Sequence, residues 1–207
     1  MTYEIEAATD RIIRTLNRNG GDTRDKAVLS SLNHASSITS QRAQAVWPVL
    51  MANLDRSQLS HNGVPTRGEV AVYTAVRLYA NYQQGQEAFV YGPSGSSKGK
   101  QPEGVQFFVA LAKLRQKEGT SKSFGGRVQN VLETTNAASV INGLSHLNKI
   151  LKGRNGAQKI DFARLAQDLY RLQANYEQAM QVQLLWGQQY FSAQPEADKK
   201  EGVQTND

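Results

Sequence analysis

The residues from Lys159 to Phe191 carry the most restrictive pattern in this chain. The segment contains no proline and one late glycine, Gly187. Its apolar residues recur three or four positions apart, or at multiples of that spacing, which places them on one stripe of an α-helix. The members of this stripe are Phe162, Leu165, Leu169, Leu172, Tyr176, Ala179, Trp186 and Tyr190. The pattern predicts one long amphipathic helix packed on a helical domain.

Two aspartates have clear roles in this predicted helix. Asp161 stands just before the apolar stripe, where an N-cap carboxylate accepts from the first amides of a helix. Asp168 lies four residues after Arg164 and three before Arg171, so that all three share one helical face. We therefore expect Asp161 to be a cap and Asp168 to pair with the two arginines.

The rest of the chain also shows helical signals. Thr66 and Glu69 form a capping box that starts a core helix of roughly eighteen residues, which ends at Gly85. We expect Ser123 and Asn136 to be caps. Further helices are expected at 2–18, 22–32, 39–46, from Pro48 onward, 103–118, 123–133 and 137–152, with Gly119 and Gly153 as stops. The sequence therefore predicts an all-α fold, a single compact domain of about seven or eight helices with a long C-terminal helix.

Composition limits the class of protein. A chain of 207 residues with 39% hydrophobic residues can bury one sizeable core. It has no run of eighteen apolar residues and no N-terminal apolar stretch of the signal-peptide type, so we expect a soluble, cytoplasmic protein. The absence of cysteine excludes disulfides and thiolate metal sites.

Two segments differ from the helical remainder. Residues 92–104 are rich in Gly, Ser, Lys and Pro, which indicates a mobile or disordered loop within a helical domain spanning 1–191. This loop is not a Walker A motif, because Ser94 and Gln101 stand where that motif needs a glycine and a Ser or Thr. Residues 192–207 have no apolar periodicity and are expected to be a disordered tail.

Positive charge is concentrated in the middle of the chain. The net charge is +6, but residues 1–97 hold nine Lys/Arg against eight Asp/Glu, whereas residues 98–171 hold thirteen against five. A local excess of this kind is typical of a phosphate-binding surface, although lysines scattered over every face would give the same count.

Several of these cations are expected at one helix–loop–helix corner. Arg115 and Arg127 flank the apolar stripes of two successive predicted helices, where a guanidinium can rest its stem on apolar surface and contact a phosphate. Only Glu118 and Glu133 are near enough in sequence to neutralise the group. The predicted binding residues at this corner are Lys113, Arg115, Lys117, Lys122 and Arg127.

Catalytic signals are nearly absent. The three histidines have no metal-ligand spacing, and no nucleophile elbow or dinucleotide loop occurs. His146 lies between two leucines and is expected at the edge of the core. We therefore expect no enzyme activity, no metal and no cofactor.

The ordered set of helical motifs resembles the CasB family, the small subunit of the type I-E CRISPR surveillance complex Cascade. The matching stretches are AVWPVLMANL, AVYTAVRLYANYQQG, FFVALAKLRQKEG, GRVQNVLETTN, LSHLNKIL, IDFARLAQDLYRLQ and VQLLWGQQYF, which run in the family's order from Val46 to Phe191. Each stretch is a weak motif, and their order is specific.

This resemblance implies an all-α, non-catalytic protein that forms a head-to-tail homodimer inside the complex, with the other Cascade subunits as partners. It implies backbone contacts to guide RNA, target DNA and the displaced strand, which stabilise the R-loop in antiviral defence. It also implies that Arg77, in the core helix, joins Arg115 and Arg127 in contacting nucleic acid.

The chain departs from the family pattern in two places. Ser30 and Ser31 stand where adjacent arginines are common, and the stretch before Phe107 lacks the usual Ser-Leu-Gly step. Lys98 and Lys100 are candidates to replace these missing family features.

The alternative function is a helical scaffold or regulator whose basic face binds an acidic protein.

Overall fold

The structure, a computed structural model, describes residues 4–17, 26–95, 101–118, 122–155 and 158–192. In these ranges it has nine α-helices, two short 3-10 helices and no strand, so the all-α prediction is confirmed. The α-helices are α1 (Glu4–Asn17), α2 (Lys26–His34), α3 (Trp47–Asn53), α4 (Arg67–Gln83), α5 (Phe107–Glu118), α6 (Lys122–Glu133), α7 (Ala137–Asn155), α8 (Phe162–Leu172) and α9 (Tyr176–Phe191). The 3-10 helices are η1 (Gln41–Val46) and η2 (Arg56–Gln58).

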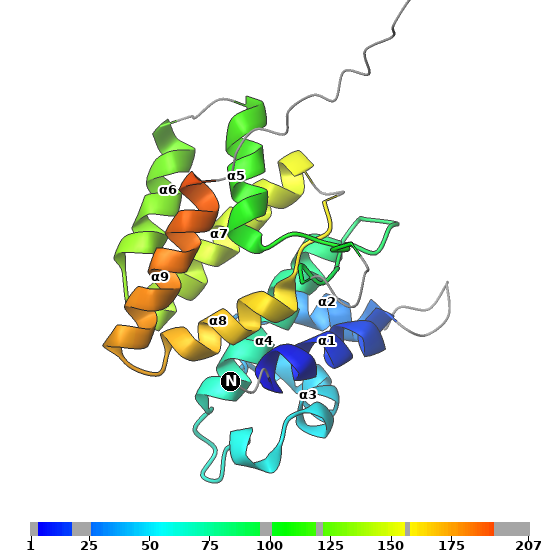
Figure 1. The fold of residues 1–207 in the computed structure, drawn as a ribbon. Helices are drawn as coiled ribbons and strands as arrows, with labels where there is room; N and C mark the ends of the chain where they lie inside the picture. Colours follow the sequence, from blue (N-terminus) through cyan, green and yellow to red (C-terminus); the bar gives the residue numbers. More distant parts are fainter. Residues whose placement is uncertain (1–3, 18–25, 96–100, 119–121, 156–157, 193–207) are drawn as a thin grey trace, which may run out of the picture.

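The helices form two bundles that share one hydrophobic core (Figure 1). In the N-terminal bundle, α8 packs against α4 and α1, α2 packs against α4, and α3 packs against α1. In the C-terminal bundle, α5 and α6 each pack against both α7 and α9. Contacts of α4 with α7 and of α8 with α9 join the two bundles.

Helix α4 is the central helix, and the sequence predicted it well. The Thr66 hydroxyl accepts from the Glu69 amide at 3.1 Å, and the Glu69 carboxylate accepts from the Thr66 amide at 2.8 Å, which completes the capping box. The helix ends two residues before Gly85, whose φ of 78° is the left-handed conformation that glycine adopts without strain. Because most of its residues are buried, α4 has no solvent face of its own.

The prediction of one long C-terminal helix is wrong, because the segment folds as α8 and α9. The chain turns at 173–175, and the side chain of Asn175 caps α9 by accepting from the Gln178 amide at 2.9 Å. Gln173 donates to the Leu169 carbonyl at 2.9 Å and so satisfies a group at the end of α8. Tyr176, expected on the buried stripe, is 71% exposed. The other members of that stripe are buried.

A polar contact joins α8 to α9 inside the core. The Trp186 indole donates to a carboxylate oxygen of Asp168 at 2.9 Å, and its ring stacks on Phe108 with 4.7 Å between centroids. Arg164 lies 4.0 Å from the second Asp168 oxygen, as predicted, whereas Arg171 donates to Gln178 and Gln181 of α9 instead. Burial raises the pKa of Asp168 to about 6 against the opposing influence of the Trp186 hydrogen bond and of Arg164.

The two ends of the predicted 92–104 loop are held in place, which corrects its boundaries. Ser94 donates from its amide and its hydroxyl to the Asp161 carboxylate at 2.7 and 2.8 Å, while Asp161 also caps α8 as predicted. Gly92 and Gly104 pass so close that a Cβ on Gly104 would lie 2.2 Å from the Gly92 carbonyl oxygen. The interior, residues 96–100 with Lys98 and Lys100, lies outside the described residues, as does the tail from 193.

Several helix boundaries also differ from the prediction. Helix α7 continues through Gly153 to Asn155, and Ser123 is the second residue of α6 and not its cap. Asn136 does cap α7, since its side chain accepts from the Ser139 amide at 3.0 Å. The predicted start at Asp22 and stop at Gly119 lie outside the described residues.

Candidate nucleic-acid interface

The central basic segment of the sequence becomes the helices of the C-terminal bundle. Helices α5, α6 and α7 contain eight Lys/Arg residues against two glutamates, Glu118 and Glu133. All three come together with α9 on one side of the molecule (Figure 1). The fold therefore concentrates in one bundle a charge excess that the sequence shows only as a linear segment.

Arg115 is positioned by aromatic rings at the end of α9. Its guanidinium carbon lies 4.6 Å from the centre of the Tyr190 ring and 5.7 Å from that of Phe191. A guanidinium stacked on aromatic faces keeps its charge and is held in one direction. Phe191 is 56% exposed, so this cation–aromatic cluster lies at the surface. The predicted flanking position of Arg115 is confirmed, and the aromatic partners come from the distant α9.

Arg127 lies on α6, next to a groove formed with α7. The groove has a volume of about 460 Å³, and Asn130, Glu133, Ser139 and His146 also line it. The Arg127 and His146 side chains are exposed, so the expectation that His146 packs at the core edge is wrong. The two helices approach closely because Gly143 has no side chain: a Cβ there would lie 2.3 Å from Val131 Cγ2.

The three predicted lysines lie on α5 and α6. Lys113, on α5, is half-buried. Lys117 is on the last turn of α5 and Lys122 begins α6, so the backbone places both at the predicted corner. The side chains of these two residues lie outside the described part of the structure.

Arg77 is separate from these groups. It projects from α4 and donates to the Ala35 carbonyl at 3.4 Å and to the Ser145 hydroxyl of α7 at 2.9 Å. Burial lowers its pKa, and Tyr73 opposes that shift. A small cavity of about 100 Å³ adjoins it, lined also by Lys149 of α7 and Asn33 of α2. Sequence reasoning missed Lys149, whose only signal was its spacing of four from Ser145.

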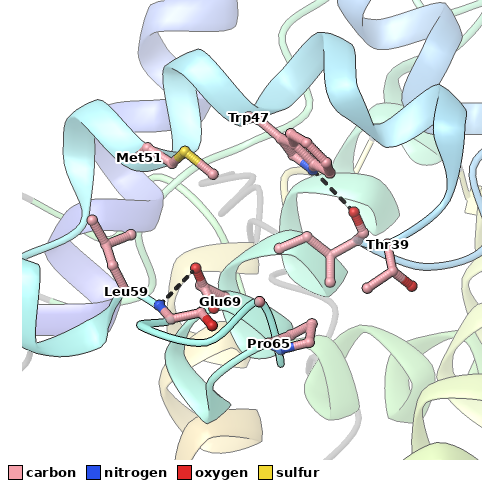
Figure 2. Close-up of a pocket in the computed structure, with 9 residues that line it drawn as sticks. Thr39, Trp47, Met51, Leu59, Pro65 and Glu69 are labelled. Carbon is pink, nitrogen blue, oxygen red and sulfur yellow. Dashed lines mark hydrogen bonds between the residues drawn. The ribbon is translucent and has the colours of Figure 1, made fainter.

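An apolar pocket lies in the N-terminal bundle, and no basic residue lines it. Trp47, Met51, Leu59 and Pro65 line a space of about 380 Å³ (Figure 2). Its polar groups are paired: the Trp47 indole donates to the Ile38 carbonyl at 3.0 Å, and Glu69 accepts from the Ser60 amide at 3.2 Å. The Glu69 carboxylate in its lining thus belongs to the capping box of α4.

The described residues show neither a metal-ligand cluster nor a membrane helix. No group of three or more His, Asp or Glu residues in these ranges could hold a metal ion. Every helix in the same ranges is too short or too polar to cross a bilayer.

Comparison with known proteins agrees with this architecture. Residues 27–191 match the family described as CRISPR-associated protein Cse2. The fold is similar to the crystal structure of CasB from Thermobifida fusca, with a TM-score of 0.66 and 18% identity over 92% of this chain and 98% of that one. No curated protein sequence matches the chain. Since the family match covers most of the sequence, the chain belongs to the Cse2 (CasB) family of CRISPR-associated proteins, subunits of the CRISPR Cascade complex.

Proposed function

We propose that this subunit braces nucleic acid within a Cascade complex in antiviral defence and catalyses no reaction itself. It contacts guide RNA, target DNA and the displaced strand through their sugar–phosphate backbones and so stabilises the R-loop. A DNA duplex and the RNA–DNA hybrid that replaces it have nearly the same free energy. A few backbone contacts can therefore shift the equilibrium towards the hybrid. Its partners are these strands, the other Cascade subunits and a second copy of the chain, in the cytoplasm.

The observation that carries this proposal is the charge of the C-terminal bundle. Helices α5, α6 and α7 hold eight basic against two acidic residues, and the two arginines expected to bind lie at its surface. Among the described residues, neither Arg115 nor Arg127 joins an ion pair, whereas Arg14 and Arg164 of the N-terminal bundle do. Cations without acidic partners are available to phosphates.

Exposed apolar side chains on the outer face of α9 indicate a contact with another protein. Met180 and Leu184 are 44% and 65% exposed, and they share a stripe with Tyr176 and Phe191. Apolar side chains grouped on one surface are common at protein contacts. In this proposal the stripe meets another Cascade subunit or the second copy.

The test measures single-stranded DNA binding as a function of salt. In the Arg115→Gln/Arg127→Gln double variant, affinity should fall similarly for unrelated sequences. The slope of log affinity against log salt should drop by roughly 1.4–1.8, because two phosphate contacts are lost. Folding should be unchanged, since both side chains lie beside the core and do not fill it.

A matched control removes the same charge elsewhere. Arg42→Gln/Arg56→Gln neutralises two exposed arginines of the N-terminal bundle and should leave the slope nearly unchanged. If the two double variants had equal effects, DNA binding would depend on the net charge of the protein and not on these particular arginines. If the Arg115→Gln/Arg127→Gln variant changes neither the affinity for DNA nor the lifetime of the R-loop, the basic face binds another partner, such as an acidic protein.

A further inference from the structure

A small polar cavity lies where α2, α4 and α7 meet. Its volume is about 100 Å³, more than a single water molecule occupies and enough for one tetrahedral oxyanion. The lining residues are Asn33, Arg77, Leu78, Asn81, Ser145 and Lys149. Two of the six are cationic and none is acidic, so the cavity has a positive lining.

Arg77 brings a charge into this cavity that the protein does not neutralise. Its two hydrogen bonds go to neutral acceptors, the Ala35 carbonyl and the Ser145 hydroxyl. Within the described residues no carboxylate pairs with it, and the group that opposes the burial effect on its pKa is Tyr73. A partly buried charge without a counterion costs free energy, which a bound anion would offset.

The other lining groups fit an anion as well. Lys149 is exposed on α7, where its ammonium can reach the mouth of the cavity while Arg77 lies deeper. The Asn33 side-chain oxygen is buried with no hydrogen-bond partner, and an amide can turn to present its NH₂ group in the same place. Ser145 donates to the Ile141 carbonyl at 2.8 Å, and its oxygen accepts from Arg77, which fixes the direction of the guanidinium.

We propose that this cavity is an oxyanion site in which Arg77 and Lys149 bind one phosphoryl group. The planar guanidinium offers two parallel N–H donors that match two oxygens of a phosphoryl group, and the lysine adds a point charge from the rim. The phosphoryl group comes either from a nucleic-acid backbone or from a free phosphate. The backbone source rests on the proposed function above, whereas the anion site itself does not.

The experiment titrates inorganic phosphate into the full chain at constant ionic strength and follows the side-chain NMR signals of Arg77. Phosphate should shift these signals in a saturable way that chloride does not reproduce. Lys149→Gln should weaken phosphate binding at least fivefold. Because Lys149 is exposed, this variant should fold normally even if Arg77→Gln, which loses contacts to Ala35 and Ser145, does not. The control, Arg42→Gln, removes one exposed charge that does not line the cavity and should bind phosphate like the wild type.

A second titration with a single-stranded thymidine oligonucleotide separates the two sources. If Lys149→Gln weakens both ligands, the site binds a backbone phosphate; if it weakens phosphate alone, the site binds a free anion. Wild-type protein that binds phosphate but no oligonucleotide would contradict the proposed function and leave the anion site standing. The proposal is overturned if phosphate does not shift the Arg77 signals, or if Lys149→Gln and Arg42→Gln bind phosphate equally.

Discussion

Helices α8 and α9 follow each other in the chain and come from one apolar pattern, yet their surroundings differ. Helix α8 buries most of its residues between α1, α4 and α9. Helix α9 buries only five, from Ala179 to Tyr190, and leaves Leu184 65% exposed. The comparison shows that an apolar residue in a helical repeat is not thereby a core residue. Each of the two helices packs against three others, so the extent of these contacts, and not the number of neighbouring helices, decides how much of each helix is buried.

The strongest test of this difference is Leu169→Ala on α8. Leu169 is 1% exposed, so its truncation removes buried apolar contacts and leaves a cavity in the N-terminal bundle. We expect a loss of about 2–5 kcal/mol in the free energy of unfolding, measured by urea denaturation. A loss below about 0.5 kcal/mol would mean that α8 is not a core helix.

The link between the two helices should depend on pH through Asp168. Its pKa is raised to about 6 in the folded state, against roughly 3.9 when unfolded, so the folded state binds the proton more tightly. Below about pH 4 this group therefore contributes roughly 3 kcal/mol to the free energy of unfolding. The contribution is lost as the pH rises to about 6. Glu6 acts in the same direction, because burial also raises its pKa.

The Asp168→Asn variant isolates this contribution. Asparagine keeps an oxygen acceptor for the Trp186 indole but does not titrate. Relative to the wild type, the variant should gain about 2–3 kcal/mol of stability between pH 4 and pH 7 in denaturation curves. A stability difference that stays constant over this range would show that Asp168 is ionised throughout.

The break between the helices should depend on Asn175. Replacing it with alanine removes the acceptor for the Gln178 amide at the start of α9. We expect a loss of about 1 kcal/mol in the free energy of unfolding, while Asn175→Asp, which keeps a capping oxygen, should lose much less. If both variants were as stable as the wild type, the turn at 173–175 would be held by packing alone.

Leu184→Ala on α9 is the counterpart of Leu169→Ala and should have the smallest effect. Since Leu184 is largely exposed, we expect a change in stability within about 0.5 kcal/mol. Co-purification with the other Cascade subunits should weaken in this variant if the α9 stripe is a protein contact. A large loss of stability in the isolated chain would show that α9 is packed on its outer face.

Local interactions could be predicted from the sequence because they join residues close in the chain. The capping box of Thr66 and Glu69, the Asp161 cap and the Asn136 cap each need only three or four residues of helical geometry. The all-α class follows from the same periodicity, which recurs along most of the chain. The ordered motifs predicted the family because each motif is also a pattern of residues close together in the chain.

The candidate site could be predicted only in part. The positions of Arg115 and Arg127 beside apolar stripes predicted surface cations, and the structure agrees. The Tyr190 and Phe191 rings under Arg115, and the pairing of Arg77 with Ser145, join residues more than sixty positions apart. A linear pattern contains no information on such contacts.

By itself the sequence determined which segments are helical, where several of them are capped, and that positive charge concentrates between residues 98 and 171. Only the tertiary structure decided that Tyr176 is exposed, that Gly153 does not end α7, and that Arg77 faces a cavity. These outcomes depend on which surfaces of distant helices meet. Their free energies come from burial and packing, and propensity adds little beside them.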